Sequence, residues 1–209
     1  MHPDDRKKRA AHAALDYLTD GLVVGVGTGS TVNHFIDGLA GIRGRIAGAV
    51  SSSESSTARL KATGIEVLDL NSAGPLELYV DGADEIAPDL SLIKGGGGAL
   101  LREKIVACAS KRMIVIADES KWVEMLGRFQ LPVEAMPFGL AATRRTIEQA
   151  CRTAGSPGPL TLRTDKDGHA FVTDGGHFIL DAALGRIEDP PFLAARLAAI
   201  PGVVEHGLF

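Results

Sequence analysis

The sequence has only two cysteines, no long apolar run and no excess of positive charge. Cys108 and Cys151 lie far apart in segments with helical patterns, so we expect buried, reduced thiols and no disulfide. No apolar run approaches the ~18 residues that a membrane span needs, and the N-terminal segment lacks the continuous apolar core of a secretory signal. A formal net charge of -4 gives no long-range attraction for nucleic acid or anionic membranes. These absences predict a cytoplasmic protein with neither kind of partner.

Metal-binding patterns are also absent from the sequence. The six histidines form no ligand-spaced cluster, and neither cysteine has neighbours that indicate a metal site. We therefore expect no metal. The basic run Arg6–Arg9 is short and leads into an apolar-periodic segment, which favours the solvated face of a helix over a nucleic-acid patch. An anionic ligand would have to be held by a local site.

Glycine, in contrast, is abundant, and many of the 25 glycines fall into tight groups. Grouped glycines indicate backbone in unusual conformations or in close contact with a ligand. The groups are Gly25, Gly27 and Gly29; Gly95 to Gly98; and Gly175 with Gly176.

The N-terminal part of the chain alternates short apolar runs with helical patterns. This alternation predicts an α/β domain over residues 1–126, with a Rossmann-like, doubly wound, mostly parallel sheet. The expected strands are Leu22–Val26, Ile46–Val50, Glu66–Leu70, Leu76–Val80, Leu90–Ile93 and Met113–Ala117. The expected helices are 4–18, 31–40, 54–63 and 99–110.

The pattern changes after Trp122 to the order strand, helix, strands, helix, strand. This order predicts a second, smaller, ferredoxin-like α+β domain over residues 127–209. A turn at Gly175 and Gly176 indicates a hairpin. The expected strands are Leu131–Met136, Leu160–Thr164, Phe171–Thr173, Phe178–Asp181 and Val203–Phe209, and the expected helices are 141–153 and 191–200.

Polar and glycine-rich clusters come directly after the expected strands of the first domain. Ligands of open parallel sheets bind beyond the carboxyl ends of the strands, so we expect the clusters to meet at one sheet edge. The serine-rich cluster is interpreted mostly as helix capping, and loops are polar in any case. The clusters are Gly27–Thr31, Ser51–Thr57, Asp81–Glu85, Lys94–Gly98 and Asp118–Lys121.

The first cluster favours a terminal phosphate over a dinucleotide. A third glycine in the G-x-G-x-x-G register would fall at Ser30 or Val32, and no acidic residue ends the second strand. Hydroxyls and backbone N–H groups at a helix N-terminus suit a phosphate monoester, although a capped turn without ligand stays open. The candidate phosphate residues are Gly27, Thr28, Gly29, Ser30 and Thr31.

Four charged residues are candidates for acid–base chemistry. Asp81 and Asp84 can face one space and serve proton transfer or grip sugar hydroxyls, or they can form a solvated acidic loop. Lys94, helped by the N–H groups of the glycines after it, could stabilise an oxyanion, or be a surface cation. Glu103 lies early in a helix, where an acidic residue is favourable in any protein. Lys121 is a candidate second phosphate contact or a surface lysine.

The chain resembles the A-type ribose-5-phosphate isomerases in order over nearly its whole length, and the combination of motifs is more specific than any one of them. The motifs are Gly-Val-Gly-Thr-Gly-Ser-Thr at 25–31, Val-Ser-Ser-Ser at 50–53, Tyr-Val-Asp-Gly-Ala-Asp-Glu at 79–85, Ile-Lys-Gly-Gly-Gly-Gly-Ala-Leu at 93–100, Arg-Glu-Lys at 102–104, Asp-Glu-Ser-Lys at 118–121, Leu-Pro-Val-Glu at 131–134, Val-Thr-Asp at 172–174 and Pro-Gly-Val-Val at 201–204.

The resemblance implies an aldose–ketose isomerase of the non-oxidative pentose phosphate pathway, acting on ribose 5-phosphate through a cis-enediolate. It implies Glu103 as general base, Lys94 at the reacting oxygens, and Asp81 with Asp84 at the sugar and in ring opening. It also implies a homo-oligomer, dimer or tetramer, no cofactor, and a further short segment beyond Phe209. The implied substrate-binding residues are Gly27, Thr28, Gly29, Ser30, Thr31, Asp81, Gly82, Ala83, Asp84, Lys94, Gly95, Gly96, Gly97 and Lys121.

Two other classes of protein stay open as alternatives. A non-catalytic sugar-phosphate sensor needs the phosphate loop but no base, and it usually carries a helix-turn-helix module, for which the N-terminal segment has no room. An amino-sugar phosphate isomerase or a CoA transferase would differ from this chain around residues 81–103.

Overall fold

The computed structural model describes residues 2–209 and divides them into two compact units. The first unit is the chain up to Ala83 together with Arg102–Ser120, and the second is Asp84–Leu101 together with Lys121–Phe209. The sequence predicts continuous domains at 1–126 and 127–209, whereas these units are discontinuous. The chain leaves the first unit after Ala83 and returns to it at Arg102.

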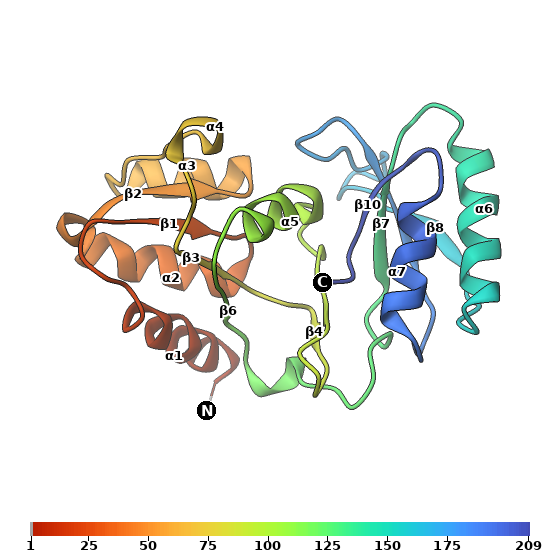
Figure 1. Cartoon of the computed structure of the whole chain (residues 1–209), viewed down its shortest axis with the longest axis horizontal. Helices are drawn as coiled ribbons and strands as arrows, with labels where there is room; N and C mark the ends of the chain where they lie inside the picture. Colours follow the sequence, from red (N-terminus) through yellow and green to blue (C-terminus); the bar gives the residue numbers. More distant parts are fainter. Residues whose placement is uncertain (1) are drawn as a thin grey trace. The chain divides into compact units, whose positions relative to one another are not determined.

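The first unit contains a four-stranded parallel sheet in the order β2-β1-β3-β6, which confirms the predicted α/β class (Figure 1). The register pairs Val26 with Ser51 and with Val80, so the carboxyl ends of β1, β2 and β3 lie side by side. The strands are β1 (Leu22–Val26), β2 (Ile46–Ser51), β3 (Leu78–Asp81) and β6 (Met113–Val115).

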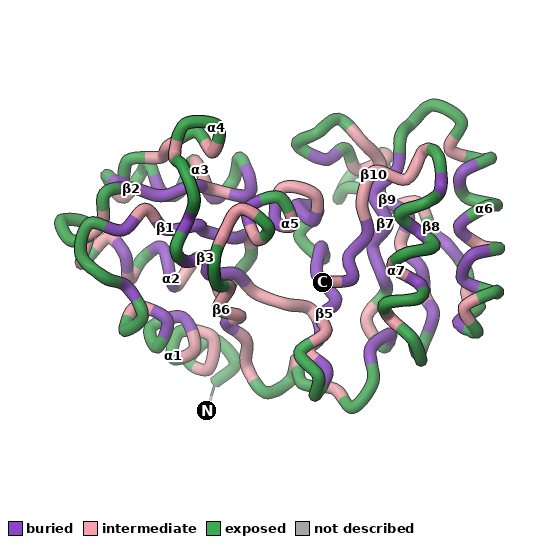
Figure 2. The backbone as a smooth tube through the Cα atoms, viewed as in Figure 1, coloured by how far each residue is buried: buried purple, intermediate pink, exposed green. Residues whose placement is uncertain are grey.

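Helices cover both faces of this sheet because both faces of its strands are apolar. On one face Val24 and Val80 pack with Ala14 of α1, Phe35 of α2 and Leu60 of α3. On the other face Tyr79 packs with Val50 and with Val106 of α5. The central strands are accordingly buried in Figure 2. The helices are α1 (Pro3–Leu15), α2 (Ser30–Gly41), η1 (Arg43–Arg45), α3 (Glu54–Ala62), α4 (Leu70–Ala73), α5 (Leu100–Cys108) and η2 (Glu119–Lys121).

The second unit contains an antiparallel sheet in the order β10-β7-β9-β8, with two helices, which confirms the predicted ferredoxin-like α+β architecture. Its core joins Leu131, Val133 and Leu180 of the sheet to Ile147 of α6 and Leu193 of α7. The elements are β7 (Leu131–Ala135), α6 (Leu140–Thr153), β8 (Leu160–Leu162), β9 (Phe178–Ala182), α7 (Pro190–Ala198) and β10 (Val203–His206).

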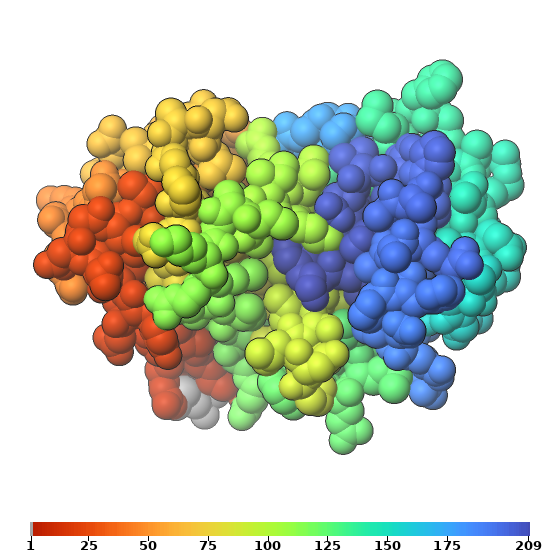
Figure 3. All heavy atoms as spheres, viewed as in Figure 1, coloured from red at the N-terminus to blue at the C-terminus, as the bar shows by residue number. Residues whose placement is uncertain are grey.

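The expected strand at Leu90–Ile93 is not part of the parallel sheet. Leu92–Ile93 forms β5, which pairs antiparallel with β4 (Glu85–Ile86) in the second unit. Leu92 also exchanges two backbone hydrogen bonds with Phe209. Figure 3 shows these C-terminal residues, in dark blue, against the yellow-green segment. A two-residue run is too short to form a central strand, and its partners come from the far end of the sequence.

Three smaller expectations are corrected. Residues 66–70 form only an isolated bridge at Val67, because the short helix α4 begins at Leu70. Residues 171–173 form no strand, since Thr173 begins a tight turn closed by its bond to His177. Both cysteines are free and lie in helices, but Cys108 is exposed. Cys151 is buried, and burial raises the pKa of its thiol to about 11.

Candidate active site

Three of the predicted polar clusters meet at the carboxyl edge of the parallel sheet. The Thr28 hydroxyl lies 3.0 Å from Ser52 Oγ and donates to Ser53 Oγ at 2.8 Å. The Thr28 N–H donates to Asp81 Oδ1 at 3.1 Å. Ser53 also caps α3 through the Ser56 N–H, as the capping interpretation predicts. The serines therefore do more than cap a helix, because they also hold the loop that follows β1.

Gly27 is the point at which this loop passes closest to Asp81. A Cβ atom on Gly27 would overlap the Asp81 carboxylate. The Gly27 N–H donates to the Val80 carbonyl at 2.9 Å, and its own carbonyl accepts from Ser56 Oγ at 2.7 Å. The backbone at this position is therefore held by β3 on one side and by α3 on the other, with no space for a side chain.

The loop ends at the N-terminus of α2, which has the features of an anion site. Gly29 is the N-cap residue, with φ 123°, and it makes no side-chain capping bond. The N–H groups of the first helical turn point along the positive end of the helix dipole. Lys7 Nζ donates to Ser30 Oγ at 3.0 Å and brings a cation to the same helix end. Lys7 is a candidate functional residue that the sequence interpretation missed.

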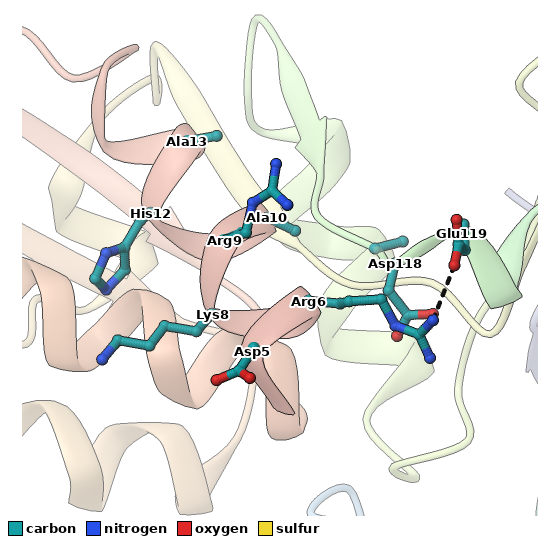
Figure 4. Close-up of a pocket in the computed structure, with 10 residues that line it drawn as sticks. Asp5, Arg6, Lys8, Arg9, Ala10, His12, Ala13, Asp118 and Glu119 are labelled. Atoms are coloured by element: carbon teal, nitrogen blue, oxygen red, sulfur yellow. Dashed lines mark hydrogen bonds and ion pairs between the residues drawn. The ribbon is translucent and has the colours of Figure 1, made fainter. Parts of the chain in front are cut away.

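The basic run on α1 is helical, as expected, but only part of it is a solvated face. Arg6 forms an ion pair with Glu119 at 2.8 Å, and Lys7 reaches Ser30, whereas Lys8 and Arg9 are exposed. Figure 4 shows the Arg6–Glu119 pair in a surface groove of about 740 Å³ between α1 and residues 117–119. None of the predicted substrate-binding residues lines this groove.

Asp81 is fully buried at the end of β3 and accepts hydrogen bonds from three sides. Its Oδ1 accepts from the N–H groups of Gly82 at 2.7 Å and Thr28 at 3.1 Å, and its Oδ2 accepts from the Tyr79 hydroxyl at 2.5 Å. Tyr79 was not among the predicted residues. The period of a strand could have identified it, because residues 79 and 81 point to the same face and a buried phenol needs a partner.

Burial and the negative charges of Asp81 and Glu103 raise the pKa of Tyr79 well above its ordinary value of 10. Tyr79 therefore stays a neutral donor to Asp81 in alkaline solution. Glu103 is the fourth residue of α5 and is 3 % exposed, so it is a buried carboxylate in the same unit as Asp81 and Tyr79.

We expect Tyr79→Phe to lower the free energy of unfolding by roughly 1.5–3 kcal/mol at neutral pH, because Asp81 loses one donor while staying buried. Above pH 10 the unfolded parent releases the phenolic proton while the folded parent keeps it, so the parent loses stability as pH rises. Tyr79→Phe lacks this loss. Urea unfolding at pH 7 to 11 should therefore show that the difference in unfolding free energy between parent and variant shrinks above pH 10. A difference that stays constant with pH would contradict the raised pKa of Tyr79.

The second unit holds the remaining predicted residues around the glycine loop. Lys94 follows β5 and is 2 % exposed, with its Nζ 5.4 Å from the centre of the Phe209 ring. It is therefore no surface cation. Asp84 Oδ2 accepts from the Gly96 N–H at 2.8 Å. Gly95 has φ 101° and its carbonyl accepts from the Gly98 N–H at 2.9 Å, which closes a tight turn that exposes Gly96 and Gly97.

The two predicted aspartates have different partners. Asp81 is bound by the loop after β1 in the first unit, and Asp84 by the glycine loop in the second. Gly82 and Ala83 connect them, and Lys121 ends η2 with a half-buried side chain. That all of these residues act on one substrate stays a prediction.

Within residues 2–209, no group of three or more His, Cys, Asp or Glu side chains is arranged to hold a metal ion. Across the same residues, no helix has the length and apolar character to cross a membrane.

A family model for ribose 5-phosphate isomerase A (phosphoriboisomerase A) matches residues 48–209. The chain belongs to the ribose 5-phosphate isomerase A family. A family member from Rhodopseudomonas palustris (strain HaA2), ribose-5-phosphate isomerase A, is 62 % identical over all of this chain and 91 % of its own length. Family membership confirms the resemblance seen in the sequence, and with it the expected aldose–ketose isomerase.

Solved structures of the family have the same fold. Ribose 5-phosphate isomerase A from Neisseria gonorrhoeae is 39 % identical with a TM-score of 0.89, over all of this chain and 88 % of its own. A D-ribose-5-phosphate isomerase in complex with phospho-erythronic acid is 35 % identical with a TM-score of 0.91, over all of this chain and 91 % of its own.

Proposed function

We propose that this chain interconverts ribose 5-phosphate and ribulose 5-phosphate, a step of the non-oxidative pentose phosphate pathway, with Glu103 as the general base. The observation that carries the proposal is the Glu103 carboxylate, which is buried in the unit that also holds Asp81 and the phosphate loop and whose charge contributes to the raised pKa of Tyr79. A carboxylate held away from bulk water is able to act as the base for a proton next to a carbonyl group, as in triosephosphate isomerase.

The reaction needs two proton transfers and no change in composition. Once the sugar ring is open, Glu103 takes the proton from C2, and the electron pair forms the C1–C2 double bond of a cis-enediolate. The proton returns at C1, and the hydroxyl proton on O2 moves toward O1, which leaves the ketone of ribulose 5-phosphate. We assign ring opening and contacts to the sugar hydroxyls to Asp81 and Asp84.

Charge that develops on O1 and O2 has to be stabilised while the enediolate exists. Lys94, which is buried, is the residue we assign to this role, together with the N–H groups of Gly95 and Gly97 in the glycine loop. The related isomerase bound to phospho-erythronic acid supports this chemistry, because a carboxylate presents two coplanar oxygens that share a negative charge, as an enediolate does.

The phosphate group is assigned to the N-terminus of α2. Its first-turn N–H groups, the hydroxyls of Thr28, Ser30 and Thr31, and the ammonium group of Lys7 offer hydrogen bonds and positive charge to a phosphate. Lys121 is assigned as a further contact. These residues bind the end of the substrate that does not react.

The proposal is tested by incubating the protein with ribose 5-phosphate in D₂O with EDTA, and following the products by NMR. We expect ribulose 5-phosphate with deuterium at C1, because the proton on Glu103 exchanges with solvent, and a rate that EDTA leaves unchanged. Binding without turnover would instead identify a sugar-phosphate sensor. Product that carries no deuterium at equilibrium would exclude the enediolate.

We further propose that the protein acts in the cytoplasm as a homo-oligomer, dimer or tetramer, without nucleic-acid or membrane partners. A phosphorylated sugar is charged and stays in the compartment where it is made. Exposed apolar side chains on the turn after β7, Met136 and Phe138, support an interface, with Phe138 91 % exposed. A monomeric mass in sedimentation equilibrium would contradict the oligomer.

A further inference from the structure

Arg163, which directly follows β8 in the second unit, is held rigidly by Asp181 of β9. Its Nε donates to Asp181 Oδ2 at 2.8 Å and its Nη2 to Asp181 Oδ1 at 2.5 Å, which is a two-pronged pair. The two side chains are 14 % and 13 % exposed, and the Arg163 N–H donates to the Ile179 carbonyl in the sheet. The guanidinium group therefore has one position.

The remaining guanidinium nitrogen holds the glycine loop. Arg163 Nη1 donates to the carbonyl oxygens of Gly95 at 2.8 Å and of Gly96 at 3.2 Å. A four-glycine segment has no side chains that could hold its peptide planes, and glycine backbone has the widest conformational freedom. Arg163 thus supplies from outside the loop the restraint that the loop sequence lacks.

These contacts determine the direction of two peptide groups, because the C=O and N–H of a planar trans peptide point in opposite directions. In the first group, Arg163 binds the Gly95 carbonyl and Asp84 accepts from the Gly96 N–H. In the second group, Arg163 binds the Gly96 carbonyl, so the Gly97 N–H points away from the guanidinium group. Gly96 and Gly97 are the exposed residues of the turn.

We propose that Arg163, anchored by Asp181, is a positioning residue for isomerisation: it orients the Gly96–Gly97 peptide so that the Gly97 N–H stabilises the enediolate. The inference rests on the proposed function, in which glycine-loop N–H groups bind the charge that develops on the substrate. Arg163 itself acts only through the backbone. Its bonds to two neutral carbonyls also polarise the peptides and strengthen their N–H groups as donors.

The test compares Arg163→Met and Arg163→Lys with the parent protein. A misoriented oxyanion donor costs roughly 10–100-fold in rate, so kcat should fall by that factor in Arg163→Met. The kcat of Arg163→Lys should lie between the values of the parent and of Arg163→Met, because an ammonium group cannot bridge one carboxylate and two carbonyls at once. Affinity for 4-phospho-erythronate, whose carboxylate mimics the enediolate, should weaken with kcat. The affinity for ribose 5-phosphate, measured in proteins that also carry the Glu103→Gln substitution, should change less than about threefold when Arg163 is replaced.

Arg144→Met is the matched control, since Arg144 also joins a carboxylate, Glu148, to a backbone carbonyl, that of Leu160, in the same unit. It should leave kcat within about twofold of the parent. The inference is overturned if Arg163→Met keeps the parent kcat, or if its affinities for ribose 5-phosphate and 4-phospho-erythronate fall equally. An inactive parent would instead count against the proposed function. Melting temperatures identify an unfolded variant, in which case Arg163→Lys decides the result.

Discussion

Replacing Glu103 with glutamine should lower kcat by about 10²–10⁴-fold, the usual contribution of a general base. Glutamine keeps the size of the side chain, and the buried position on α5 is unchanged, but an amide cannot take the C2 proton. The loss should appear in kcat, because Glu103 is assigned to the reacting carbon and the phosphate is held elsewhere. Ribose 5-phosphate should still bind to the variant.

The measurement is the initial rate of ribulose 5-phosphate formation, together with ribose 5-phosphate affinity from calorimetry. Glu77→Gln is the control, because Glu77 is an exposed acid of the same unit that pairs only at the surface with Lys111. Its kcat should stay within about twofold of the parent. Turnover by Glu103→Gln within about threefold of the parent would remove Glu103 as the base.

Gly27→Ala should disrupt both stability and activity, because the added methyl group would occupy the space of the Asp81 carboxylate. Asp81 is fully buried and held by Tyr79 and Thr28, so it cannot move without breaking those bonds. Overpacking of this kind typically costs ~1–3 kcal/mol, and broken hydrogen bonds to a buried charge add to it. We expect a loss of at least about 3 kcal/mol in the free energy of unfolding.

Urea unfolding measures this loss, and Gly44→Ala provides the control. A Cβ atom on Gly44 meets nothing within 4 Å, so this substitution should change the free energy of unfolding by less than about 0.5 kcal/mol. The folded fraction of Gly27→Ala should bind ribose 5-phosphate weakly, because the displaced loop carries Thr28 and leads directly into Ser30, the first residue of α2. A Gly27→Ala protein as stable and active as the parent would contradict the close approach described here.

The sequence predicts a structural element best where the local pattern of apolar residues agrees with the burial of those residues in the fold. β1 was predicted with its observed ends, Leu22–Val26, because it is a continuous apolar run bounded by turn residues. The three clusters that meet at the sheet edge were predictable for a similar reason, since parallel strands bring their carboxyl ends together. The contact of Lys7 was not predictable. Its bond to Ser30 depends on how α1 packs beside α2, and the periodicity of α1 carries no information about that packing.

Contacts between distant parts of the chain account for what was missed. Lys94 lies against the ring of Phe209, and the glycine loop is bound by Arg163. Neither residue has a local signal that connects it to residues 94–98. The placement of β5 was wrong for the same reason, because the strand pattern puts Leu92–Ile93 in the parallel sheet and its tertiary pairing with β4 puts it elsewhere.

The pairing of β5 with the C-terminal residues sets an order of events during synthesis on the ribosome. Every residue of the first unit has been made once the chain reaches Ser120. The second unit begins with Asp84, and Leu92 pairs with Ile86 of β4, but Leu92 and Lys94 also bond to the backbone of Phe209 and Gly207, more than a hundred residues later. The lysine and glycine loop assigned to the enediolate are thus translated early but gain these contacts only after Gly207 and Phe209 have been made, so a ribosome that stalls in between leaves a catalytic loop without them.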